Sequence, residues 1–118
     1  MAATVEDVVF NLKKQIMIVI KYSESSDNGM SDIEIDEKAT NIALDFMSKI
    51  PSIRAVLETD VLAAFEGDPA ASSNDEIILS YPGILAISIF RIAHELHLLG
   101  VPMLPRIMTE HAHSITGI

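Results

Sequence analysis

The stretch that most constrains the fold is residues 81–100, YPGILAISIFRIAHELHLLG. It opens as an almost purely apolar run, which charged residues and histidines then interrupt. The uninterrupted run is shorter than the ~20 apolar residues that a bilayer-spanning helix needs. At helical spacing, Ser88, Arg91 and Glu95 form one narrow polar stripe, and a helix that is apolar elsewhere is buried on most sides. The pattern therefore predicts a central core helix over 82–100, and no membrane span is expected.

The composition suits a small helical domain in a reducing compartment. The chain has 118 residues, of which 49% are hydrophobic and only 5% aromatic, enough for a packed core of aliphatic side chains. A net charge of −9 disfavours nucleic-acid binding, because the phosphate backbone would be repelled. The absence of Cys excludes disulfides and thiolate metal sites. The acidic N-terminus is unlike a secretory signal, so we expect a cytoplasmic protein.

Start and stop signals predict an all-α fold, a compact bundle of about six helices. Thr4 can cap the first helix, and Ser31 with Glu34 forms a capping box for the second. Pro51 is expected to end the second helix and to open a third, which ends near Gly67. The expected helices begin after Thr4, at Ser31, at Pro51, at Ser73, at Pro82 and at Pro102.

The histidines are the first candidates for chemistry. His94 and His97 are three positions apart, whereas the zinc motif H-E-x-x-H needs a spacing of four. His111 and His113 are two apart and diverge on a helix. We therefore interpret the histidines as packing or hydrogen-bonding residues, and we expect no metal site.

Asp68 and Arg91 are the other candidates, and the residues alone leave two interpretations of each open. Arg91 in an apolar helix needs a carboxylate partner, either Glu95 or an acid on another helix. Asp68 precedes Pro69, which favours an N-cap followed by proline. Alternatively, Asp68 faces a cleft with the polar edge of Arg91 and holds a cationic group of a substrate.

The order of features over roughly residues 66–118 is distinctive. GDPAA is followed by a Tyr-Pro-Gly helix start, then by RIAHELHLLGVP and a helix that runs into TGI. This order resembles the N-terminal helical domain of bacterial serine O-acetyltransferases. The resemblance implies transfer of an acetyl group from acetyl-CoA to the hydroxyl of L-serine, which gives the O-acetylserine used in cysteine synthesis. The first ~60 residues are only compatible with the family, because terminal regions vary.

The resemblance also implies a domain organisation. In the family, the helical domain precedes a left-handed parallel β-helix, which forms trimers and carries the catalytic histidine and its partner acid. The helical domains commonly join two trimers into a hexamer. We therefore expect residues 1–118 to be the N-terminal domain alone, inactive by itself and without a bound cofactor, acetyl-CoA being a co-substrate of the whole enzyme. The family's contact with the cysteine-forming lyase uses a C-terminal tail outside this chain.

One substrate-binding residue carries over from the resemblance. The aspartate of the family's Asp-Pro-Ala segment helps to bind serine, and it matches Asp68. Arg91 and His94 match the family's Arg-x-x-His and are assigned a supporting role; no catalytic residue is expected within the chain. The alternative hypothesis is a stand-alone acidic helical module that binds a protein partner without catalysis.

Overall fold

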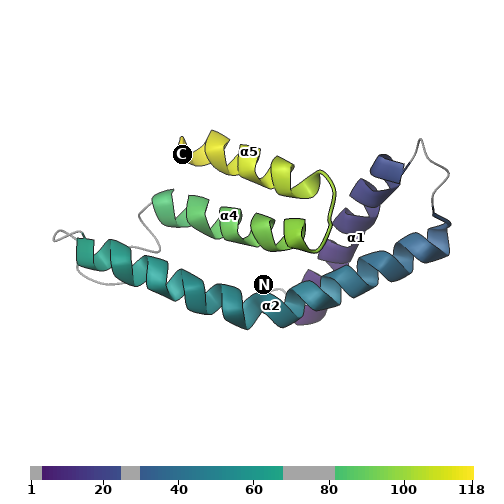
Figure 1. Ribbon diagram of the computed structural model, residues 1–118, viewed down its shortest axis with the longest axis horizontal. Helices are drawn as coiled ribbons and strands as arrows, with labels where there is room; N and C mark the ends of the chain where they lie inside the picture. The colour runs from purple at the N-terminus through teal and green to yellow at the C-terminus, as the bar shows by residue number, and fades with distance from the viewer. Residues whose placement is uncertain (1–3, 25–29, 68–81) are drawn as a thin grey trace.

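The computed structural model describes residues 4–24, 30–67 and 82–118. These residues form helices and no strands, which confirms the all-α class. Figure 1 shows α4 lying between α2 and α5, while α1 packs against the first half of α2. The short helix expected from Ser73 lies outside the described residues. The helices are α1 (Val5–Glu24), α2 (Asp32–Gly67), α4 (Pro82–Leu98) and α5 (Leu104–Thr116).

Both predicted N-terminal caps are present. The amide of Asp7 donates to Thr4 Oγ1 at 3.1 Å, and the Thr4 amide donates to Asp7 Oδ2 at 3.2 Å. At α2, the Glu34 amide donates to Ser31 Oγ at 3.2 Å, and the Ser31 hydroxyl donates to Glu34 Oε1 at 3.1 Å. The first pair satisfies two amides and the second pair one amide that have no partner within the helix. The predicted starts of these two helices are confirmed.

The predicted break at Pro51 is wrong. Residues 32–67 form one helix of 36 residues with Pro51 inside it. Proline removes one backbone hydrogen bond and normally kinks or breaks a helix. Here Phe46 before the proline and Ile53 after it belong to the same buried cluster, so packing holds both halves together. Figure 1 shows that α2 changes direction near its middle without ending.

The length of α2 sets the shape of the described part of the protein. A helix of 36 residues extends about 54 Å at 1.5 Å per residue. The molecule measures 56 × 28 × 27 Å, so its long axis is close to the length of this one helix. The expected six short helices would have made a compact bundle, whereas α2 makes the molecule elongated.

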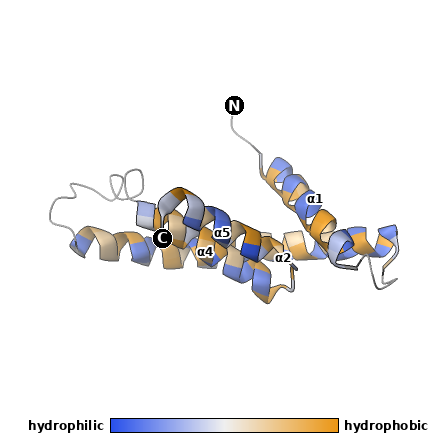
Figure 2. Ribbon diagram, turned by 90° about the horizontal axis from the view of Figure 1, so that it is seen from above, coloured by the Kyte–Doolittle hydropathy of each residue, from blue (hydrophilic) through white to orange (hydrophobic). Residues whose placement is uncertain are grey.

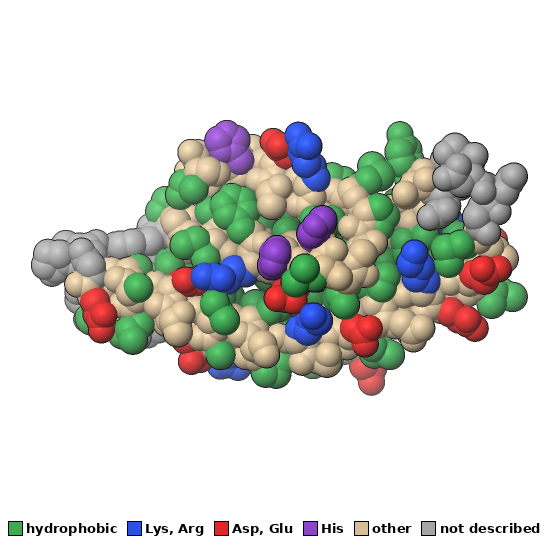
Figure 3. Space-filling model, in the orientation of Figure 1, with side chains coloured by type: hydrophobic (Ala, Val, Ile, Leu, Met, Phe, Trp, Pro, Cys, Tyr) green, Lys and Arg blue, Asp and Glu red, His purple; other side chains and the backbone are tan. Residues whose placement is uncertain are grey.

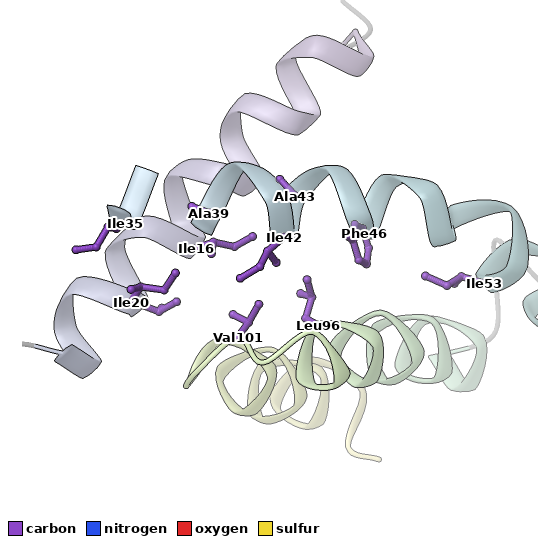
Figure 4. Packing of buried hydrophobic residues seen from close by; sticks show 11 residues of the cluster. Ile16, Ile20, Ile35, Ala39, Ile42, Ala43, Phe46, Ile53, Leu96 and Val101 are labelled. Carbon is purple, nitrogen blue, oxygen red and sulfur yellow. The ribbon is translucent and has the colours of Figure 1, made fainter. Parts of the chain in front are cut away.

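The main core lies where α1, the first half and middle of α2 and the end of α4 meet. Figure 4 shows its side chains pointing toward one another from all three helices. Ile16, Ile20 and Leu96 are the largest side chains that are almost completely buried. Val61 and Ile84 form a second, much smaller buried cluster between the end of α2 and the start of α4.

The connection from α4 to α5 begins at Gly100, the glycine that was predicted to end the preceding helix. Gly100 has φ 82°, and its amide donates to the carbonyl of His97 at 3.0 Å, while the Val101 amide donates to the carbonyl of Leu96 at 3.1 Å. This is the Schellman pattern, in which buried Leu96 and Val101 supply the apolar contact. The predicted end of this helix at Gly100 is confirmed.

The predicted start of the last helix at Pro102 is wrong by two residues. Met103 has φ 62° and ψ −46°, which is not a helical conformation, and the Leu104 amide donates to the Pro102 carbonyl at 2.5 Å. The helix therefore begins at Leu104, with Pro105 in its first turn, where a missing amide has no cost. Its end is a left-handed Gly117, whose amide donates to the carbonyl of His113.

Candidate functional site

The candidate site follows from an ion pair between α2 and α4. Arg91 Nε donates to Asp60 Oδ2 at 2.6 Å, and Arg91 Nη2 donates to Asp60 Oδ1 at 2.9 Å. Two parallel bonds between a guanidinium and a carboxylate fix orientation as well as distance. Of the two partners that the sequence left open for Arg91, the structure selects an acid on another helix. Asp60 was not among the residues singled out in the sequence.

The environment of this pair keeps the arginine charged. The Asp60 side chain is 18% exposed and that of Arg91 is 41% exposed. The hydrogen bonds that Arg91 donates to Asp60, aided by the charge of the carboxylate, raise the pKa of Arg91 above its usual value, and partial burial lowers it less. The guanidinium therefore stays protonated across the physiological pH range.

A second ion pair also joins α2 and α4. Glu95 Oε2 lies 3.4 Å from Lys49 Nζ, so Glu95 also forms an ion pair with α2. Figure 3 shows charged side chains and histidines gathered over the interface between α2 and α4, with hydrophobic side chains between them. The polar stripe predicted on residues 82–100 thus faces α2, and both of its charged members are neutralised by partners there.

A groove of about 320 Å³ lies along the interface between α2 and α4. Its walls are apolar side chains of both helices, and its polar residues all come from α4. His94 is exposed and borders the groove. The structure thus places two of the predicted residues, Arg91 and His94, side by side on one groove. The lining residues are Ile53, Val56, Ile87, Phe90, Arg91, His94 and Glu95.

Asp68 lies outside the described residues. It directly follows Gly67, the last residue of α2, in the chain. Its predicted roles as helix cap or substrate ligand therefore stay predictions.

The histidines do not meet around a common centre. His94, His97, His111 and His113 are all exposed. Within 4–24, 30–67 and 82–118, no three or more His, Cys, Asp or Glu side chains gather in a way that could hold a metal ion. In the same part of the chain, no helix is both long enough and apolar enough to cross a membrane.

Together these features define an all-α domain in which two ion-paired helices flank the segment that carries Asp68. No protein-family model matches the chain. Over 84 residues, 71% of the chain, it is 46% identical to the plasmid serine acetyltransferase of Synechococcus elongatus. It is also 40% identical over 63 residues to the serine acetyltransferase of Bacillus subtilis. The chain spans about a quarter of the length of these curated relatives, 26% and 29%.

Solved structures extend the similarity to nearly the whole chain. The crystal structure of serine acetyltransferase 1 from Entamoeba histolytica, in complex with L-cysteine, superposes with a TM-score of 0.75 and 32% identity. The match covers 97% of this chain and 37% of that one. It thus includes the first half of the sequence, where the resemblance alone was not specific. The chain is a homologue of the serine acetyltransferases and corresponds to a helical part of them.

Proposed function

We propose that the chain is the N-terminal helical domain of an acetyl-CoA-dependent serine O-acetyltransferase. The complete enzyme converts L-serine to O-acetyl-L-serine for cysteine biosynthesis. The observation that carries the proposal is the 46% identity over 84 residues to a serine acetyltransferase. The structural match over 97% of the chain supports the same assignment independently.

The chemistry of the complete enzyme is general-base catalysis. A histidine of the β-helix domain takes the proton of the serine hydroxyl as its oxygen attacks the thioester carbonyl, and an acid orients the imidazole. Both groups lie outside residues 1–118 in this proposal. Residues 1–118 by themselves are therefore expected to be inactive.

The helical domain contributes Asp68 to the serine site. The negatively charged carboxylate binds the positively charged ammonium group of serine. It thereby holds the serine hydroxyl near the catalytic histidine. Arg91 and His94 support this region without contacting the reacting atoms. The proposal rests on the position of Asp68 in the Asp-Pro-Ala segment.

The domain also brings copies of the enzyme together, as its family resemblance implies. The exposed apolar residues of α1 support this part of the proposal. Val5, Phe10 and Ile18 are each more than half exposed. Figure 2 shows α1 diverging from the other helices toward its first residue, with hydrophobic positions along it. Burial against a second copy would remove this apolar surface from water.

The test is an acetyl-transfer assay on the product of the complete gene. CoA release from acetyl-CoA is measured with L-serine, with L-alanine as the control that lacks the hydroxyl. Serine-dependent release by the complete protein, and none by residues 1–118, is the expected result. A complete protein that shows no serine-dependent release contradicts the enzyme assignment and favours the stand-alone interaction module.

A further inference from the structure

The groove between α2 and α4 has an apolar half and a polar half. Ile87 and Phe90 line it nearer the start of α4, whereas Arg91 and Glu95 line it nearer the end. Val56 belongs to the apolar lining that α2 contributes. The volume of about 320 Å³ lies at the lower end of the roughly 300–1,000 Å³ that small-molecule sites occupy. The groove therefore suits a small ligand with one apolar and one polar end.

The polar half of the groove offers one charged group of each sign. Arg91 and Glu95 lie four positions apart, so both project from the same face of α4, with their Cβ atoms about 5–6 Å apart. Arg91 uses Nε and Nη2 for its hydrogen bonds to Asp60, and Glu95 pairs with Lys49 through Oε2. Nη1 of the guanidinium and Oε1 of the carboxylate take no part in these contacts. Each group therefore keeps an atom with which it can bind a ligand.

The charges around the groove sum to zero. Arg91 is balanced by Asp60 and Glu95 by Lys49, and His94 is counted neutral at pH 7. A ligand with a single charge would leave that charge unbalanced in a partly apolar groove, which is unfavourable. An anion would also approach a chain whose net charge is −9. The groove therefore favours a ligand that carries a positive and a negative group and no net charge.

We propose that this groove binds an α-amino acid with an apolar side chain. The ligand carboxylate binds Arg91, with His94 beside it as a further hydrogen-bonding group, and the ligand ammonium group binds Glu95. Both ligand groups are attached to the same carbon atom, which suits partners on neighbouring turns of one helix. The ligand side chain lies against Phe90 and Val56, where its apolar surface leaves water. The inference does not rest on the proposed function, because binding needs only residues of the groove.

The experiment measures binding of L-leucine to the product of the complete gene by isothermal titration calorimetry. Saturating L-serine is present and acetyl-CoA is absent, so leucine that competes with serine does not contribute. Leucinamide lacks the carboxylate, isocaproate lacks the ammonium group, and L-alanine lacks most of the apolar side chain. We expect Kd for leucine to be at least about tenfold lower than Kd for each of these compounds, because each has lost one of the proposed contacts.

Val56→Glu tests whether leucine binds in this groove. Val56 is 41% exposed, so we expect the variant to fold, while its carboxylate makes the apolar half unfavourable for the leucine side chain. Kd for leucine should rise at least about tenfold. Leu44→Glu is the matched control, since it adds the same charge to α2 at a residue that is 54% exposed and does not line the groove. Its Kd for leucine should equal that of the wild type.

Glu95→Gln is the second variant, and it tests the polar half of the groove. The amide keeps the shape of the side chain but removes the charge that binds the ammonium group. The preference for leucine over isocaproate should therefore fall from at least about tenfold to about twofold or less. Circular dichroism of each variant verifies that its helices are intact.

The outcomes separate this inference from the proposed function. Leucine binding that needs both charged groups, and that is weakened by Val56→Glu but not by Leu44→Glu, supports the site. Absence of leucine binding, equal weakening by both α2 variants, or an unchanged preference in Glu95→Gln overturns it. A complete protein that binds leucine in this way but does not acetylate serine contradicts the proposed function and leaves the inference standing.

Discussion

At the scale of single residues, two glycines of the α4 region show how backbone conformation alone decides the effect of a methyl group. A Cβ added at Gly83 or at Gly100 meets no atom of the described residues within 4 Å, so neither substitution causes a clash with them. Gly100 has φ 82°, a conformation that costs an L-residue about 1–2 kcal/mol. Gly83 lies within α4, where alanine is favoured over glycine by up to about 1 kcal/mol.

We therefore predict opposite signs for the same substitution. Gly100→Ala should lower the free energy of unfolding by about 1 kcal/mol, and Gly83→Ala should raise it by a few tenths to about 1 kcal/mol. Urea unfolding followed by circular dichroism measures both. If Gly100→Ala proved as stable as the wild type, the left-handed conformation at position 100 would cost alanine no more than it costs glycine.

The ion pair of Arg91 shows where residue-level prediction stops. The sequence required an acidic partner, since a partly buried guanidinium without one is unfavourable. The identity of that partner is a tertiary fact, because Asp60 lies 31 positions away and on another helix. Glu95, which is adjacent on the same helix face, was an equal candidate until the structure paired it with Lys49. Asp68 was singled out from its sequence motif, and its role stays a prediction because it lies outside the described residues.

At the scale of helices, local sequence signals predicted where helices begin and end. They did not predict that α2 continues through Pro51. Thr4, Ser31 and Gly100 act through hydrogen bonds within a few residues, so their effect is visible in the sequence. Pro51 was misjudged because the buried contacts on either side of it involve α1 and α4, which lie far away in the chain. Tertiary packing outweighed a local penalty of about 3 kcal/mol.

This view of α2 predicts that Pro51 is tolerated and not required. Pro51→Ala restores a backbone donor inside the helix, and the exposed side chain contributes little packing. We expect the free energy of unfolding to rise by about 1–2 kcal/mol, less than the full helix penalty of proline because the alanine chain is freer when unfolded. Thermal unfolding provides the measurement. A less stable variant would mean that the change of direction in α2 is itself needed for packing.

The end of α4 offers a matched pair for the core. Leu96 is 1% exposed between α2 and α1, whereas Leu98, two positions on, is 60% exposed. Leu96→Ala should lower the free energy of unfolding by about 3 kcal/mol through lost burial and a residual cavity. Leu98→Ala should change it by less than about 0.5 kcal/mol. Denaturant unfolding of both variants would contradict the assigned core if their losses were equal.

At the scale of the whole molecule, α2 connects the two parts of the domain. Its first half and middle form the main core with α1 and α4, and its last turns lead to the segment that carries Asp68. The all-α class followed from composition and periodicity, but the elongated shape did not, because it depends on two predicted helices being one.

The substrate role of Asp68 is the prediction that depends on the whole enzyme. Asp68→Asn keeps the ability to cap a helix but removes the charge that attracts the serine ammonium. A hydrogen bond to a charged group contributes about 1.5–3 kcal/mol, so KM for serine should rise about 10- to 100-fold while KM for acetyl-CoA is nearly unchanged. Glu58→Gln, which removes one negative charge from an exposed side chain of α2, is the control and should leave both constants unchanged. Unchanged serine kinetics in Asp68→Asn would remove Asp68 from the substrate site and leave it as a helix cap, because the amide caps as well as the carboxylate.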